Sequence, residues 1–243
     1  MTEIVQPKSL EARTEKISPI RKAIAKNLKE VMNTIAYCAL TRKGDVSALW
    51  DLRKKNVTAV LEKEGVKLTF LSWIIKATAI ALSEHQAFIG SWNEETGEIT
   101  YPDSINISIA VDTPYGLVVP VIRNVEKLSI VEIQKEIVRF AKLAQDRKLT
   151  MKDMTGGCFT ITNVGSVGVL HGSPIPNKGN VGILAVGAIA DEVKVNKDGS
   201  FSPSKQLYLT IAADHRWVDG ADMARLNNRV FELLEKPELL GEL

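Results

Sequence analysis

The amino-acid sequence predicts an α+β fold in which a mixed β-sheet is covered by helices. Residues 105–111 alternate between apolar and polar side chains, which is typical of a strand with one buried face. Residues 129–140 carry apolar side chains at helical spacing, which indicates an amphipathic helix. The expected helices and strands follow one another irregularly, and several strands are joined directly by turns. A regular, alternating doubly wound fold is therefore not expected.

The first half of the chain has four expected elements, bounded by residues that start or stop regular structure. Ser18 can cap a helix, and Pro19 suits its first position. Asp45 can cap a second helix, which Gly65 ends. In chain order we expect a helix from Ser18, a strand over 35–41, a helix from Asp45 to Gly65, and a buried apolar helix that begins at Thr69 and includes 70–82.

The second half is expected to contribute most of the sheet. Ser129 and Glu132 form a capping-box signature at the start of the amphipathic helix. Turns are predicted at 94–97, 113–116 and 196–199. We expect strands over 105–111, 117–122, 159–164, 181–189 and 207–213, followed by a last helix over about 221–234.

Composition excludes several classes of function. The formal net charge is +2 and aromatic residues are few, which argues against a nucleic-acid-binding surface. The longest apolar stretch, 70–82, is too short to span a membrane, and the first dozen residues do not resemble a secretory signal. Cys38 and Cys158 are expected to be buried and reduced. We therefore expect a soluble cytoplasmic protein, or one of the mitochondrial matrix if the source is eukaryotic.

The chain is expected to consist of one domain preceded by a short arm. Residues 1–16 are polar, contain Pro7 and show no sustained period, which is typical of a linker. Residues 17–243 are numerous enough to bury a substantial core.

The strongest chemical signal is a histidine at the end of the last predicted strand. His215 follows an apolar run, and a rigid strand end can present a side chain to a cleft. Imidazole titrates near neutral pH, so His215 can accept and return a proton within one turnover. Asp219 lies four residues later and can steady the same loop. From spacing alone, a structural role for both residues, with His215 ending the strand and Asp219 capping the last helix, is an equal alternative.

No metal site is expected. His85 and His171 do not have metal-ligand spacing with other histidine, cysteine or aspartate residues. The glycines between 165 and 179 are not followed by the Gly-Lys-Ser/Thr sequence of a phosphate-binding P-loop.

Residues 214–220, Asp-His-Arg-Trp-Val-Asp-Gly, resemble the DHRxxDG motif of dihydrolipoamide acyltransferases, the E2 components of 2-oxo acid dehydrogenase complexes. The related chloramphenicol acetyltransferases and peptide-synthetase condensation domains usually have a second histidine at the position of Asp214. The resemblance runs from about Ile17 to the C-terminus. Four further segments match in the family's order, at 18–25, 112–121, 156–165 and 181–187.

The resemblance implies a chloramphenicol acetyltransferase-like fold and transfer of an acyl group between coenzyme A and a dihydrolipoyl thiol. His215 would be the general base that deprotonates the attacking thiol. Thr162 stands at the position of the family's serine and would stabilise the oxyanion with its hydroxyl. Asp219 would organise the catalytic loop, and Arg21 would lie near coenzyme A. Thr162 as an ordinary strand residue and Arg21 as a solvated helix charge are the alternatives.

The resemblance also implies partners. The family core is a trimer with active sites between subunits, so His215 is expected to meet Thr162 of a neighbouring copy, and trimers join into hollow cages. Residues 233–240 resemble the tail that plugs an adjacent trimer, and exposed leucines are expected there. Gly241 departs from that tail. The lipoyl group would come from a separate lipoyl domain, and the E1 and E3 enzymes would bind through another domain. Neither domain fits before Ile17, so 1–16 is interpreted as a linker remnant.

Two segments depart from the family. Residues 171–180 lack its F-x-P-I-I-N-P-P run, and residues 33–37 lack its Pro-His pair. Residues 51–55 and 65–71 resemble bacterial pyruvate-complex E2 sequences, so acetyl transfer is favoured over a branched-chain acyl group. The other hypotheses are a free-standing chloramphenicol-type acetyltransferase, against which Asp214 argues, and a scaffold without catalytic activity.

Overall fold

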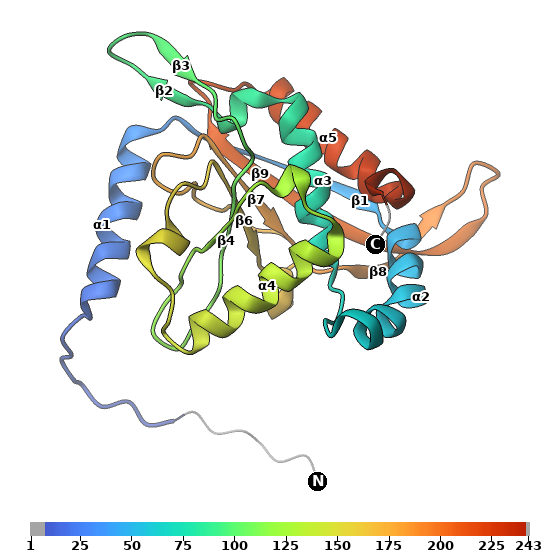
Figure 1. Ribbon diagram of the computed structural model, residues 1–243, viewed down its shortest axis with the longest axis horizontal. Helices are drawn as coiled ribbons and strands as arrows, with labels where there is room; N and C mark the ends of the chain where they lie inside the picture. The colour runs from blue at the N-terminus through green and yellow to red at the C-terminus, as the bar shows by residue number, and fades with distance from the viewer. Residues whose placement is uncertain (1–7, 242–243) are drawn as a thin grey trace.

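The computed structural model describes residues 8–241, which form a seven-stranded sheet, a separate hairpin and five α-helices (Figure 1). The sheet order is β1 (Tyr37–Asp45), β9 (Phe201–Asp214), β7 (Gly182–Val186), β6 (Phe159–Asn163), β4 (Ile107–Ile109), β5 (Val121–Ile122), and β8 (Ala190–Val195) pairs with β9. β6 is parallel to β4 and β7, and the other pairs are antiparallel. The predicted α+β class with a mixed sheet is confirmed.

The helices begin and end close to the predicted positions, with one correction: Asp45, predicted to cap α2, is the last residue of β1, because that strand continues beyond its predicted end, and the N-cap of α2 is Val46. The bounds are α1 (Pro19–Thr34), α2 (Ser47–Glu64), α3 (Phe70–Glu84), α4 (Ile130–Gln145) and α5 (Gly220–Glu235). Five short 3₁₀ helices connect them, η1 (Gln86–Ile89), η2 (Val125–Lys127), η3 (Met151–Met154), η4 (Gly165–Val167) and η5 (Pro237–Leu240). Ser18 caps α1 by accepting the Arg21 N–H at 3.2 Å, and Ser129 forms the expected capping box with Glu132. Gly65 ends α2 with a φ of 71°, a conformation that glycine adopts without strain.

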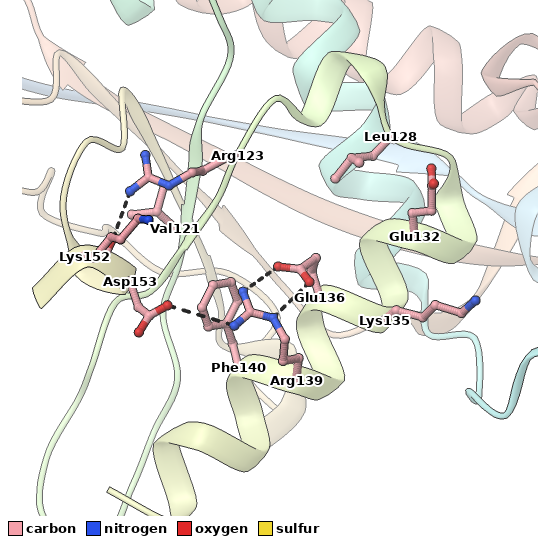
Figure 2. A pocket seen from close by; sticks show the side chains of 10 residues that line it. All are labelled: Val121, Arg123, Leu128, Glu132, Lys135, Glu136, Arg139, Phe140, Lys152 and Asp153. Carbon is pink, nitrogen blue, oxygen red and sulfur yellow. Dashed lines mark hydrogen bonds and ion pairs between the residues drawn. The ribbon is translucent and has the colours of Figure 1, made fainter. Parts of the chain in front are cut away.

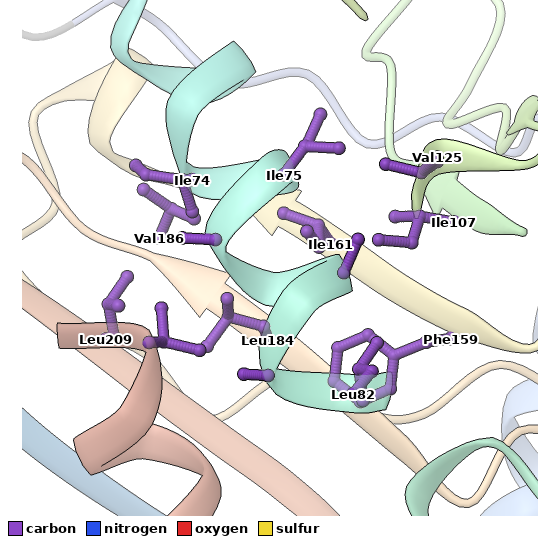
Figure 3. Packing of buried hydrophobic residues seen from close by; sticks show 14 of the residues in the cluster. Ile74, Ile75, Leu82, Ile107, Val125, Phe159, Ile161, Leu184, Val186 and Leu209 are labelled. Carbon is purple, nitrogen blue, oxygen red and sulfur yellow. The ribbon is translucent and has the colours of Figure 1, made fainter. Parts of the chain in front are cut away.

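The core lies between the sheet and the helices on one of its faces (Figure 3). α3 is buried along most of its length, as its apolar sequence predicts, because it packs on the sheet and is flanked by α4 and α5. Ile74 and Leu82 of α3 face the strand residues Ile161 and Leu184. The alternate residues of these strands point to the other face of the sheet.

Several observed strands have other bounds than predicted: β1 continues to Asp45, β7 ends already at Val186, and β9 begins already at Phe201. Two further differences concern burial and continuity. All three residues of β4 are buried, including Ser108, whereas the alternation predicted one exposed face. The reason is that Gly157 packs directly on the Ser108 side chain and leaves no room for a Cβ. The second predicted strand, 117–122, is reduced to β5 and to an isolated bridge between Val118 and Val111.

Two elements were not predicted. The turn at 94–97 joins a two-stranded hairpin of β2 (Ser91–Asn93) and β3 (Glu98–Thr100), which stands apart from the main sheet in Figure 1. β8 forms a second hairpin with β9 across the predicted turn at 196–199. Both hairpins are short or largely exposed, so their sequences lack the apolar runs by which the other strands were recognised.

The expectation of exposed leucines at the C-terminus is wrong for most of them. Leu233, Leu234 and Leu240 are 2%, 0% and 4% exposed, because the last helix and η5 pack them into the chain's own core. Leu239, with 52% of its surface exposed, is the large apolar side chain of this segment that faces outward. Residues 242–243 lie outside the described residues.

The N-terminal arm, the two cysteines and the length of the apolar helices were also the subject of predictions. Residues 1–7 of the predicted arm lie outside the described residues, and 8–16 contain neither helix nor strand. Cys38 and Cys158 are free thiols that are only partly buried, and burial raises the pKa of Cys158. Within residues 8–241, no helix is both long and apolar enough to span a membrane.

Asp214, the last residue of β9, connects the end of this strand by a hydrogen bond to the segment between α1 and β1. Its buried carboxylate accepts hydrogen bonds from the backbone N–H groups of Ala36 at 3.1 Å and Arg216 at 3.2 Å. The Arg216 guanidinium donates two more, from Nε at 3.0 Å and from Nη2 at 2.7 Å. Burial by itself raises the pKa of Asp214, but these bonds and the Arg216 charge outweigh it and hold the pKa below its ordinary value.

We expect Leu184→Ala to lower the free energy of unfolding by about 2–5 kcal/mol, because it leaves a cavity under α3. The matched control is Leu61→Ala on α2, where the side chain is 46% exposed and the expected change is within about 0.5 kcal/mol. Urea denaturation measures both variants. Equal losses would contradict the assignment of Leu184 to the core.

We expect Asp214→Asn to lower the free energy of unfolding at neutral pH by about 1.5–3 kcal/mol, since charged hydrogen bonds are lost. A depressed pKa means that the Asp214 contribution is complete above the unfolded pKa of about 4 and is lost as the pH falls through the lower folded value. Urea denaturation between about pH 3 and 7 should therefore show a weaker acid dependence in the variant. An identical acid dependence in both proteins would refute this role.

Candidate functional site

His215 lies in the turn that leads from β9 to α5, with its side chain exposed. Its backbone N–H donates to the Ala36 carbonyl at 2.7 Å, so the main chain at this position is fixed. The turn is closed by a bond of 3.1 Å from the Trp217 N–H to the Asp214 carbonyl. A rigid backbone with an accessible imidazole is the arrangement that a general base requires.

Asp219 is the N-cap of α5. Its carboxylate accepts the Asp222 N–H at 2.8 Å, and the Asp222 carboxylate accepts the Asp219 N–H at 3.1 Å. This reciprocal pair fixes where the helix begins and so where the turn that carries His215 ends. The capping alternative for Asp219 is therefore observed. That Asp219 organises a catalytic loop, as the resemblance implies, stays a prediction.

Thr162 lies on β6, on the face of the sheet opposite to the core residue Ile161. It lines a cavity of about 420 Å³, whose apolar walls come from neighbouring strands, from α1 and from the loop at 172–177. Within the described part of the chain, its hydroxyl has no hydrogen-bond partner. The hydroxyl is therefore available to a ligand in this cavity.

The loop at 171–180, which departs from the family's sequences, is tied to the same face of β6. Thr160, two residues before Thr162, donates to the Asn180 side chain at 2.8 Å and accepts from Asn177 at 3.1 Å. The Tyr37 hydroxyl donates to the Pro174 carbonyl at 3.1 Å. Sequence reasoning missed these residues, although Thr160 could have been found from its two-residue spacing to Thr162.

Arg21 is exposed in the first turns of α1, where it lines a second cavity of about 670 Å³ with both polar and apolar walls. Ser18, Thr113 and Tyr115 also line it, as does the carboxylate-bearing Asp112. The N-terminal end of α1 adds a partial positive charge to this cavity, which favours an anion. Leu117 lines both cavities, so the sites of Arg21 and Thr162 are neighbours.

The structure does not bring His215 and Thr162 together within one chain. Thr162 is in register with Ala185 of β7, which pairs with Thr210 of β9. His215 lies five residues beyond Thr210, so at about 3.4 Å per residue and 4.8 Å per strand the two lie about 20 Å apart. Thr162 and Arg21 lie at one end of the sheet, and His215 and Asp219 lie at the other.

Another cavity, of about 580 Å³, lies between α4 and the edge strand β5 and contains none of these residues (Figure 2). Its charges are largely paired with one another or with groups at its rim. Arg139 binds Glu136 at 2.6 Å, and Arg123 donates to the Lys152 carbonyl at 2.8 Å. Within residues 8–241, no three His, Cys, Asp or Glu side chains are grouped so that they could hold a metal ion.

Comparison with known proteins identifies relatives along the whole chain. The model of the family described as 2-oxoacid dehydrogenases acyltransferase (catalytic domain) matches residues 9–242. The dihydrolipoyllysine-residue acetyltransferase component of pyruvate dehydrogenase complex from Corynebacterium glutamicum is 40% identical over 247 residues, which cover 100% of this chain. The chain spans 37% of the length of that relative.

Solved structures show the same fold. Dihydrolipoamide acetyltransferase of Azotobacter vinelandii superposes with a TM-score of 0.90 at 32% identity, over 97% of this chain and 99% of that one. A cubic core of the pyruvate dehydrogenase multienzyme complex gives 0.90 at 31% identity, over 97% of this chain and 99% of the other. Chloramphenicol acetyltransferase shares the fold at 12% identity, with a TM-score of 0.52 over 86% of this chain and 94% of that one. The chain therefore belongs to the family of 2-oxoacid dehydrogenase acyltransferase catalytic domains.

Proposed function

We propose that residues 17–243 form a catalytic domain that transfers an acyl group between coenzyme A and a dihydrolipoyl thiol. The observation that carries the proposal is that the fold presents two groups: an exposed imidazole on a fixed turn and, in an apolar cavity, a hydroxyl without a partner among residues 8–241. Acyl transfer between thiols needs these two groups, a base for the thiol and a donor for the oxyanion.

His215 accepts the proton of the attacking thiol, because the thiolate is the nucleophile and a free thiol is mostly protonated near neutral pH. The thiolate attacks the thioester carbonyl carbon, and the negative charge moves to the carbonyl oxygen. The Thr162 hydroxyl donates a hydrogen bond to this oxygen. The tetrahedral intermediate collapses and breaks its bond to the second sulfur, which receives the proton back from His215. The same steps in reverse order transfer the acyl group in the opposite direction.

The active site is shared between two copies of the chain, with His215 from one and Thr162 from its neighbour. The separation of about 20 Å within one chain supports this arrangement, since a single donor bond spans about 3 Å. A trimer supplies three such sites. At each one, the end of the sheet that carries His215 in one chain meets the end that carries Thr162 in the next chain.

The Azotobacter vinelandii structure supports the choice of residues. The crystallographic and enzymatic work on that protein concerns the role of a serine, a histidine and an asparagine in its catalytic mechanism, and the asparagine is four positions after the histidine. Asp219 lies at that spacing from His215. Asparagine and aspartate are both strong N-cap residues, so the role that fits both is capping α5 at the end of the catalytic turn.

Arg21 binds a phosphate of coenzyme A in the cavity at the start of α1. A guanidinium and the positive end of a helix are both suited to phosphate, although Asp112 on the same wall restricts where the anion lies. The adjoining cavity beside Thr162 has mainly apolar walls, which suits the uncharged arm that bears the thioester. An acetyl group is the proposed acyl group, because relatives of this chain are acetyltransferase components.

The whole protein is proposed to act as the core of a pyruvate dehydrogenase complex. Its trimers associate further into a cage, as in the cubic core that this chain superposes on. The exposed Leu239 of η5 is the side chain available for such contacts in the last described segment. A lipoyl domain supplies the dihydrolipoyl thiol, and the E1 and E3 enzymes are the remaining partners.

We expect His215→Ala to lower kcat for acetyl transfer from acetyl-CoA to dihydrolipoamide by about 10² to 10⁴, the usual contribution of a positioned base. Thr162→Val should lower it by about 10² to 10³, because the oxyanion loses its donor. His85→Ala, at the end of α3, is the matched control and should leave kcat unchanged. A folded His215→Ala variant with full activity would exclude His215 from the reaction, and a fully active Thr162→Val would exclude Thr162.

Mixing the two inactive variants tests the shared site. In trimers that combine His215→Ala with Thr162→Val chains at random, about a quarter of the contacts pair an intact His215 with an intact Thr162 from its neighbour. Acetyltransferase activity should therefore rise to about a quarter of the wild-type value after unfolding and refolding the variants together. Separately refolded variants, mixed afterwards, provide the control. Activity no higher than that control would show that both residues act from the same chain.

A further inference from the structure

The hairpin β2–β3 has one apolar face, and this face packs against the turn that carries His215. Trp92 and Ile99 are directly opposite in the hairpin and partly buried, whereas the alternate residues of both strands are exposed. A two-stranded hairpin is marginally stable on its own, so its position depends on what this face contacts. Trp92 packs against the core and contacts Trp217, two residues after His215.

The indole rings of Trp92 and Trp217 are stacked. Their centroids lie 4.5 Å apart and their planes differ by 9°. The Trp92 Nε1 is buried with no hydrogen-bond partner within the described residues, so packing rather than hydrogen bonding holds this ring. The stack fixes the turn on the C-terminal side of His215.

A second contact from the same hairpin reaches Arg216, the residue next to His215. Glu94 binds the Arg216 Nη1 at 2.7 Å, while the other side of the guanidinium is bound to Asp214. Glu94 is 60% exposed, so this ion pair alone contributes little. It nevertheless links the hairpin to the guanidinium that Asp214 holds, and this guanidinium lies 5.1 Å from the Trp217 ring centroid.

We propose that Trp92, assisted by Glu94, is a positioning residue for His215, and that the hairpin β2–β3 clamps the catalytic turn in its reactive geometry. The inference rests on the proposed function of His215. Backbone bonds to Ala36 and the cap at Asp219 fix the two ends of the turn. Between them, Arg216 is bound by the Asp214 carboxylate and by Glu94 of the hairpin, and Trp217 packs against the core and stacks on Trp92 of the hairpin. A displacement of about 1 Å in a catalytic group can cost about 10²-fold in rate, so this clamp affects turnover.

The decisive experiment measures the effect of Trp92→Ala on kcat for acetyl transfer from acetyl-CoA to dihydrolipoamide. The substitution is made in the wild-type protein, in His215→Ala and in Thr162→Val. In the wild-type background kcat should fall about 10- to 100-fold with little change in KM. In the His215→Ala background Trp92→Ala should cause less than about a twofold further loss, since there is no imidazole left to position. In the Thr162→Val background the full loss should persist, because Thr162 acts independently of the turn.

Conservative variants serve as controls. Trp92→Phe keeps a stacked aromatic ring and should restore most of kcat. Glu94→Gln should lower kcat by about twofold, as expected for an exposed ion pair. Glu95→Gln, on the same hairpin, should have no effect because the Glu95 side chain makes none of these contacts.

Equal losses from Trp92→Ala in the wild-type and His215→Ala backgrounds would overturn the inference, since they would indicate a general loss of folded protein. An unchanged kcat in Trp92→Ala, with His215→Ala inactive, would overturn it while leaving the proposed function intact. A measurement independent of activity is the rate at which diethyl pyrocarbonate modifies His215, with His85 and His171 as internal references. Trp92→Ala should change the His215 rate several-fold and leave the other two unchanged, and an unchanged His215 rate would also refute the clamp.

Discussion

The candidate site depends on the hydrogen bonds that the buried carboxylate of Asp214 accepts. This carboxylate holds the Ala36 N–H and the Arg216 guanidinium together at the end of β9. A buried carboxylate stays charged only where hydrogen bonds replace water, and here four donor groups do so. The turn that follows therefore has one geometry. That geometry leaves the His215 imidazole without a hydrogen bond to any residue from 8 to 241, and it places Arg216 where Glu94 of the hairpin β2–β3 binds it.

The remaining parts of the candidate site follow from the alternation of side chains along the sheet. Ile161 points into the core while Thr160 and Thr162 point to the opposite face, where one binds the loop at 171–180 and the other remains available. Because β9 runs antiparallel to β7 and β7 runs parallel to β6, the end of β9 lies away from the end of β6. The sheet thus separates His215 from Thr162, which is why the proposed active site combines residues of two copies of the chain.

Local chemistry made most of the elements predictable. Ser18, Gly65 and the Ser129–Glu132 pair set helix ends through short-range hydrogen bonds and φ preferences, which depend on a few adjacent residues. The hairpin β2–β3 was missed because one partly buried Trp92 and one Ile99 do not form a recognisable pattern. The leucines near the C-terminus were misjudged, because their burial depends on helices far away in the sequence.

The sequence by itself determined the family, the histidine at a strand end, the capping aspartate and the hydroxyl at position 162, because each is encoded by residue types at short spacing. Only the tertiary structure decided that His215 and Thr162 lie at opposite ends of one sheet, that Arg21 neighbours Thr162, and that Trp92 stacks on Trp217. These relations depend on strand order and on packing between segments more than fifty residues apart, for which spacing in the chain carries no information.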